Sequence, residues 1–218
     1  MKCEVCGMEY GVSHSCGGPR SPEAQQIAMA DMTPPAGAGP AYYLGEAWKI
    51  VGWDDLAIRR NSKDAAATTY GVLFWFASML LILVIQTYPL MKMKLANASP
   101  GTLAVGMVFG LAFGMIVMGL ITFLQLGLCH LIAKVSFGAS GKFVEVMRPL
   151  LLGWFVNCLI LIPVAGMLLA GIGWTAVLMM VFEEVDGIGR LQAFGISAGI
   201  NVCFFAIQIA LMPTTHHL

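Results

Sequence analysis

Uncharged apolar runs alternate with short charged segments along this chain. The longest run, residues 95–133, contains no Asp, Glu, Lys or Arg, and another covers residues 65–90. A helix rises about 1.5 Å per residue, so about 20 apolar residues cross the roughly 30 Å hydrocarbon core of a bilayer. Both runs are long enough, and we expect each to form a membrane-spanning helix.

The C-terminal third holds a further uncharged run, residues 149–182, and a last one, residues 191–212, which Pro213 ends. At helical rise the first of these would reach about 51 Å, which is too long for one bilayer crossing. We therefore expect two short spans joined near residues 170–173, with Pro163 kinking the first of them. Hydropathy alone leaves the total at four or five spans.

Glycines recur at helical spacing inside two of these runs. Gly106, Gly110 and Gly114 fall four apart in the longest run, and Gly195 and Gly199 do so in the last one. Residues four apart share a helix face, and small residues on that face let another helix approach closely in lipid. We predict that both faces pack against helices. The partner helix belongs either to the same chain or to a second copy, so the sequence allows a homo-oligomer.

Residues 41–64 mix aromatic with charged side chains and are too polar to span. Leu44, Trp48, Val51 and Ile58 recur there roughly at helical spacing. One interpretation is a helix whose apolar face rests among lipid headgroups, where aromatic rings are favoured. The other is a soluble helix packed beneath the membrane domain, and the sequence favours neither.

The first 18 residues carry a set of possible metal ligands, Cys3-x2-Cys6 followed by His14-x-Cys16. Zinc takes four N or S ligands in a tetrahedron, and four protein ligands leave no open position for catalysis. We expect a structural zinc knuckle over residues 1–18, with the metal supplying its folding energy. A flexible Pro-, Gly- and Ala-rich linker follows over residues 19–40. The alternative is a flexible, reduced head with incidental cysteines.

Composition and motifs argue against two classes of function, nucleic-acid binding and catalysis. The chain is 58% hydrophobic and 11% charged, with zero formal net charge and a mean hydropathy of +0.80. Zero net charge gives no electrostatic basis for binding nucleic acid. The sequence contains neither His-Glu-x-x-His nor Gly-x-Ser-x-Gly, so we expect no enzyme.

Polar residues in or beside the apolar runs are candidate bundle residues: His130, Asn157, Glu183, Asn201 and Gln208. We expect a structural hydrogen bond from His130, which lies close to a polar loop. A buried amide seeks a partner in lipid, so we expect Asn157 to join two helices. Glu183-Glu184-x-Asp186 is interpreted as a solvated turn. Alternatively, these polar side chains line a transport path.

Lys and Arg are distributed unevenly about the expected spans. With five spans and the N-terminus inside, the outside segments carry only Lys92 and Lys94 of the 12 basic residues. Basic residues favour the cytoplasmic side of a membrane. We therefore expect a cytoplasmic N-terminus, where thiolates stay reduced.

Several short motifs resemble one family. They are His130-x3-Lys134, the loop Phe-Gly-Ala-Ser-Gly-Lys-Phe at 137–143, Pro163, Gly173-Trp174, and the turn Gly-Arg-Leu-Gln-Ala at 189–193. In order and spacing they resemble the Yip domain, the Ypt-interacting protein family of small membrane proteins, over about residues 41–212. The resemblance implies five spans, a cytosolic N-terminus, and a cytosolic loop between spans two and three.

Eukaryotic members of that family bind prenylated Rab-type GTPases and act in vesicle traffic. This chain lacks their Asp-Leu-Tyr-Gly-Pro type motif and has a zinc-like head in place of a long N-terminus. Both departures favour a prokaryotic inner membrane as the setting.

These features predict an all-α polytopic bundle of five transmembrane helices over residues 65–213, with a small N-terminal zinc knuckle. The predicted function is a non-enzymatic scaffold or adaptor in the lipid bilayer. Its zinc head and the loop at 135–148 would present a cytosolic face to a protein partner. The alternative is a small transporter or channel that uses the polar bundle residues.

Overall fold

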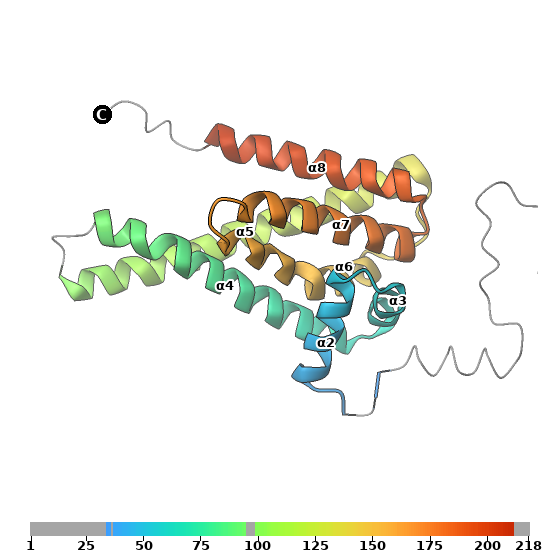
Figure 1. Ribbon diagram of the computed structural model, residues 1–218, viewed down its shortest axis with the longest axis horizontal. Helices are drawn as coiled ribbons and strands as arrows, with labels where there is room; N and C mark the ends of the chain where they lie inside the picture. The colour runs from blue at the N-terminus through green and yellow to red at the C-terminus, as the bar shows by residue number, and fades with distance from the viewer. Residues whose placement is uncertain (1–33, 36, 95–98, 212–218) are drawn as a thin grey trace, which may run out of the picture. The chain divides into compact units, whose positions relative to one another are not determined.

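The computed structural model describes residues 34–35, 37–94 and 99–211, and these contain helices and no strand (Figure 1). The described residues from Ala38 onward form one compact unit. Its helices, labelled as in Figure 1, are α2 (Pro40–Val51), α3 (Asp55–Lys63), α4 (Ala66–Lys94), α5 (Pro100–Phe137), α6 (Phe143–Gly153), the 3₁₀ helix η1 (Trp154–Leu161), α7 (Gly166–Asp186) and α8 (Arg190–Leu211). The predicted zinc knuckle and most of the linker that follows it lie outside the described residues.

Among the described residues, four helical segments are long and apolar enough to cross a bilayer. They are Ala66–Pro89, Gly101–Phe137, Phe143–Leu161 and Gly166–Asp186. This agrees with the predicted all-helical integral membrane protein. The large apolar side chains on the outside of these segments support it, because Phe109 and Phe113 of α5 are about three-quarters exposed in the isolated chain. Side chains of this kind are stable where they face lipid rather than water.

The long uncharged run of the C-terminal third breaks at residues 162–165, so the predicted joint near residues 170–173 is wrong. The break falls at Pro163, which has no N–H to continue a helix, and Val164 follows in a left-handed conformation with φ 69°. A Cβ on Gly166 would lie 2.5 Å from the carbonyl oxygen of Leu159. Only glycine lets α7 begin so close to the end of η1.

The amphipathic segment forms two helices rather than one. Ile58 is fully buried in α3, whereas Leu44 and Trp48 are exposed on α2, so the predicted apolar stripe does not lie on one face. Trp53 reverses the chain between the two helices with φ 65°. Both helices pack against α6, and α3 also packs against α7. The inner faces of α2 and α3 are therefore buried against the helices of the membrane unit.

Close approaches between helices occur mostly at glycines other than those predicted. A Cβ on Gly71 of α4 would lie 2.8 Å from Cβ of Leu151, and one on Gly173 of α7 would lie 2.7 Å from Cγ2 of Val156. Gly114 does face another helix, since a Cβ on it would lie 3.3 Å from Cδ1 of Leu83 in α4. The two α8 glycines, Gly195 and Gly199, would place a Cβ within 4 Å of no described atom outside their own helix. Gly106 and Gly110 lie on the same α5 helix and are partly buried.

Candidate functional site

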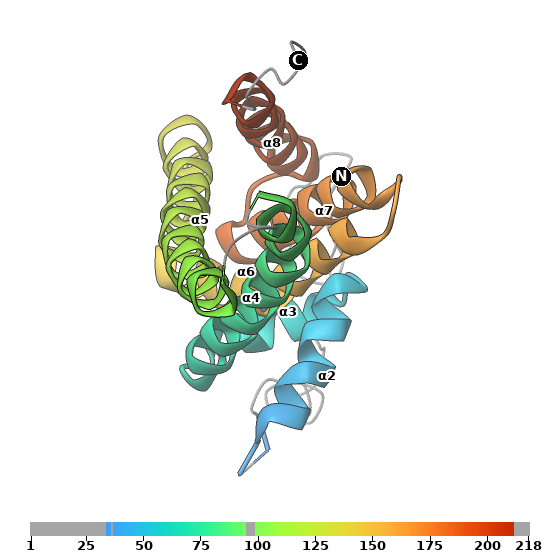
Figure 2. The same ribbon diagram turned by 90° about the vertical axis from the view of Figure 1, so that its left-hand side faces the viewer.

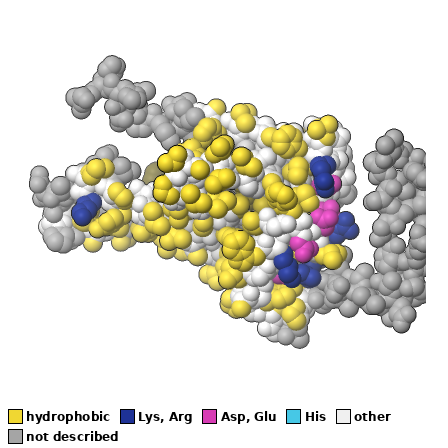
Figure 3. All heavy atoms as spheres, in the orientation of Figure 1, with side chains coloured by type: hydrophobic (Ala, Val, Ile, Leu, Met, Phe, Trp, Pro, Cys, Tyr) yellow, Lys and Arg dark blue, Asp and Glu magenta, His cyan; other side chains and the backbone are white. Residues whose placement is uncertain are grey.

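Charged side chains gather at one end of the bundle, which we call the polar end (Figure 3). Three ion pairs there join segments that are far apart in the sequence, and they are Arg59–Glu184, Lys63–Glu145 and His130–Asp186. The others, Glu46–Lys49, Glu46–Arg60 and Glu183–Arg190, join nearer residues. These pairs connect α2, α3, α5, α6, α7 and α8 at one face of the unit. Ion pairs therefore hold the helix ends at the polar end together.

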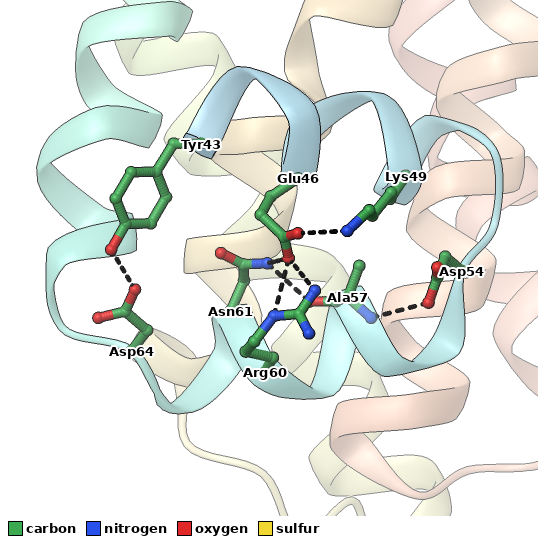
Figure 4. A network of polar contacts seen from close by, with 8 residues as sticks. All are labelled: Tyr43, Glu46, Lys49, Asp54, Ala57, Arg60, Asn61 and Asp64. Atoms are coloured by element: carbon green, nitrogen blue, oxygen red, sulfur yellow. Dashed lines mark hydrogen bonds and ion pairs between the residues drawn. The ribbon is translucent and has the colours of Figure 1, made fainter. Parts of the chain in front are cut away.

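A buried carboxylate holds α2 to α3 (Figure 4). Glu46 is 1% exposed, and its Oε2 accepts hydrogen bonds from Arg60 Nε at 2.9 Å and Arg60 Nη2 at 2.5 Å. Asn61 Nδ2 donates to the same oxygen at 2.8 Å, and Lys49 Nζ donates to Oε1 at 3.0 Å. Burial opposes the charge of Arg60, but its hydrogen bond to Glu46 and the carboxylate charge outweigh burial and raise the pKa of Arg60. A buried charge that is paired and hydrogen-bonded in this way is tolerated.

A second hydrogen bond, from Tyr43 to Asp64, joins α2 to the residue that follows α3. Tyr43 of α2 donates its hydroxyl to Asp64 Oδ2 at 2.5 Å, and its ring stacks on that of Tyr70 with centroids 4.2 Å apart. Burial and the hydrogen bond to Asp64 both raise the pKa of Tyr43. Asp54 begins α3 by accepting a hydrogen bond from the backbone N–H of Ala57 at 2.9 Å, as N-cap residues do. These contacts fix the position of α2 relative to the first span.

The predicted hydrogen bond from His130 exists, and its partner is Asp186. Nδ1 of His130 lies 3.1 Å from Oδ2 of Asp186, whose side chain is fully buried. Asp186 is therefore no part of a solvated turn, because α7 extends far enough to place it one turn beyond the buried Phe182. Oδ1 of Asp186 has no hydrogen-bond partner among the described residues.

The loop between α5 and α6 packs directly on this buried pair. The backbone N–H of Ser140 donates to the carbonyl oxygen of Asp186 at 3.2 Å. A Cβ on Gly141 would overlap Oδ1 of Asp186, so only glycine permits this approach. Gly138 and Gly187 both take left-handed φ values, 68° and 69°, as the chain leaves α5 and α7. The Gly-rich loop is thereby fixed against the end of α7.

The other candidate bundle residues do not converge on one site. Asn157 donates to the carbonyl oxygen of Trp154 at 2.9 Å within its own helix, so this bond does not join two helices. Glu183 pairs with Arg190 at the polar end, and the side chain of Gln208 lies outside the described residues. Asn201 is the amide that joins helices. It accepts from Gln125 of α5 and donates to Thr175 Oγ1 of α7 at 2.7 Å.

Sequence reasoning therefore missed Glu46, Gln125, Thr175 and the burial of Asp186. The available signal for Gln125 was a lone amide within the longest uncharged run, since a polar group in lipid seeks a partner. Glu46 gave no such signal, because acidic residues of a mixed segment are ordinarily exposed. Among the described residues, no group of three or more His, Cys, Asp or Glu side chains is arranged to hold a metal ion.

Two of the quoted motifs meet at Asp186, where His130 lies against its side chain and the 137–143 loop packs on the same residue. The 189–193 turn makes a local contact, in which Gly189 donates its N–H to Gln192 Oε1 at 3.0 Å. The chain matches no family model, no curated protein and no solved structure. The resemblance to the Yip domain therefore stays a prediction from these motifs and their order in the chain.

Proposed function

We propose that this protein is a non-enzymatic integral membrane scaffold or adaptor of the Yip type, which presents its polar end and a zinc-binding head to a cytosolic protein. The observation that carries the proposal is the polar end itself. Ion pairs from six helices stiffen one face of the bundle, while the candidate polar residues of the spans scatter to separate places. A stiff surface suits the docking of a partner because little order is lost on binding.

In this proposal α8 is the fifth span. Its 22 residues would extend about 33 Å at helical rise, enough for the hydrocarbon core. Five spans place the polar end and the N-terminal head on one side. The bias of Lys and Arg assigns that side to the cytoplasm, and a prokaryotic inner membrane is the setting that we favour.

Charge reversal at the polar end tests the docking role. Arg59→Glu with Lys63→Glu changes two exposed cations there, and Lys92→Glu is the matched change at the end of α4 that leads into the next loop. We expect a partner crosslinked in cells to the full-length protein to be lost with the double variant and retained with Lys92→Glu. An unchanged set of crosslinked partners in the double variant would contradict the proposal.

Metal content tests the head separately. The purified full-length protein is expected to carry about one zinc ion per chain, since four ligands complete one tetrahedral site. A Cys3→Ser and Cys6→Ser double variant is expected to carry none. Deleting residues 1–18 while all crosslinked partners are kept would show that the head is not the docking element.

Transport is the second candidate, and one observation favours it. The side chains of Gln125, Asn201 and Thr175 form a hydrogen-bonded chain across α5, α8 and α7. If this chain lines a path, flux of a permeant solute into vesicles should fall when Asn201 is replaced by Leu. Flux that is equal in vesicles with and without the protein would exclude this candidate for that solute.

A further inference from the structure

Helix α2 presents apolar side chains on both of its faces: Tyr43, Ala47 and Ile50 are buried against the bundle, whereas Leu44 and Trp48 are exposed. Its carboxylate, Glu46, is 1% exposed, whereas Trp48 is 63% exposed and Leu44 is 49% exposed. An amphipathic helix on a soluble protein turns its apolar stripe inward and its charges outward. The outer face of α2 therefore suits an apolar environment better than water.

The outer face consists of Ala41, Leu44, Gly45 and Trp48, all of them exposed. No carboxylate lies on this face. Lys49, at its margin, is half-exposed and reaches back to Glu46 Oε1 at 3.0 Å. A long basic side chain at such a margin can keep its stem in an apolar layer and its ammonium group near lipid phosphates.

The position of α2 fits the boundary of a bilayer. It crosses the spans instead of running alongside them (Figure 1), and in the view along the bundle it extends sideways beyond them (Figure 2). Such a helix would lie along the membrane surface. The indole of Trp48 packs edge-on against Phe155, with ring centroids 5.0 Å apart, and Phe155 belongs to the apolar segment Phe143–Leu161. The outer face of α2 is thus continuous with the side of a candidate span.

We propose that the outer face of α2 lies in the headgroup region of the bilayer leaflet at the polar end, with lipid as its occupant. Continuity with the side of a span favours lipid over a soluble partner. Tryptophan is enriched at this depth because its ring is apolar and its N–H is polar. Contact with lipid makes α2 an in-plane anchor beside the first span, independent of the scaffold role proposed above.

Quenching of tryptophan fluorescence tests the occupant. The full-length protein is placed in phosphatidylcholine–phosphatidylglycerol vesicles, and two quenchers are used in separate experiments. Acyl chains brominated close to the headgroup quench rings that face lipid, and acrylamide in the aqueous phase quenches rings that face water. Trp48→Phe is compared with the parent, and Trp75→Phe is the matched control because Trp75 is 8% exposed. Trp48→Phe changes only an exposed ring and keeps an aromatic contact for Phe155, and far-UV circular dichroism confirms its helix content.

At equal protein concentration, Trp48→Phe is expected to lower the amount of emission quenched by the brominated lipid and to leave the amount quenched by acrylamide unchanged. The Trp75→Phe control is expected to change neither amount. A fall in the acrylamide-quenched amount instead would place Trp48 in water and overturn the proposal. If Trp48→Phe changes neither amount, protein covers the ring. Appearance of lipid quenching only on dilution of the protein in the vesicles would identify that cover as a second copy. Either result also overturns the proposal.

Discussion

Replacing Glu46 with Ala should release α2 from the bundle. The substitution removes the buried carboxylate that accepts hydrogen bonds from Arg60 and Asn61. It leaves the apolar contacts of α2 in place, because Tyr43 and Ile50 stay buried. The variant therefore isolates what the charge network contributes to holding this helix.

The structure sets the size of the effect. Removing one partner of a buried ion pair costs about 3–5 kcal/mol, because the other charge loses its compensation. The Arg60 side chain keeps 13% exposure and can regain some water, which favours the lower end of that range. Lys49 is 52% exposed, so its pair with Glu46 adds little. A loss of about 3 kcal/mol corresponds to a roughly 100-fold larger population of the open state.

Amide hydrogen exchange measures that population directly. Exchange of the α2 backbone amides that follow Pro40 should become roughly 100-fold faster in Glu46→Ala of the full-length protein, whereas the α5 amides should exchange as in the parent. Glu46→Gln keeps the length of the side chain and one acceptor, so its effect should be closer to tenfold. Parental exchange rates in Glu46→Ala would refute the reasoning. Equal acceleration in α5 would show that the network stabilises the whole unit and not α2 alone.

Three further predictions concern the stability of the purified protein in detergent. His130→Ala should cost about 2 kcal/mol of unfolding free energy, because the buried Asp186 side chain loses its hydrogen-bond partner, and replacing both residues with Leu should be less harmful than His130→Ala alone. Equal thermal unfolding midpoints for the parent and His130→Ala would contradict this. Asn201→Leu should cost about 1 kcal/mol, because Asn201 joins three helices, and Asn157→Leu should cost less, because its amide bonds within its own helix. The reverse order of midpoints would count against the interhelical role of Asn201. The pKa of Tyr43 is raised in the folded state, so the parent should lose stability relative to Tyr43→Phe as the pH rises above 10.0, the ordinary tyrosine value. Parallel stability curves for the two proteins through that range would show that the hydroxyl does not titrate as proposed.

The sequence by itself determined the class of the protein and the approximate limits of two of its long helices. Bilayer thickness and the need to satisfy every backbone group within lipid act locally, so a long uncharged run is enough to predict a span. The expected span at 65–90 corresponds to Ala66–Pro89, and the expected last span at 191–212 corresponds to the helix Arg190–Leu211. The zinc knuckle at residues 1–18 stays a prediction, because it lies outside the described residues.

Tertiary structure decided which polar side chains are buried. Glu46 meets Arg60 14 residues away, and His130 meets Asp186 56 residues away. Hydropathy treats each residue alone and gives no indication of a partner at that distance. The close-approach glycine, Gly141, was equally hidden, because its neighbour Asp186 is brought to it only when α7 packs beside the end of α5. Local composition thus specifies a membrane helix, whereas the burial of a charge depends on the partner that folding supplies.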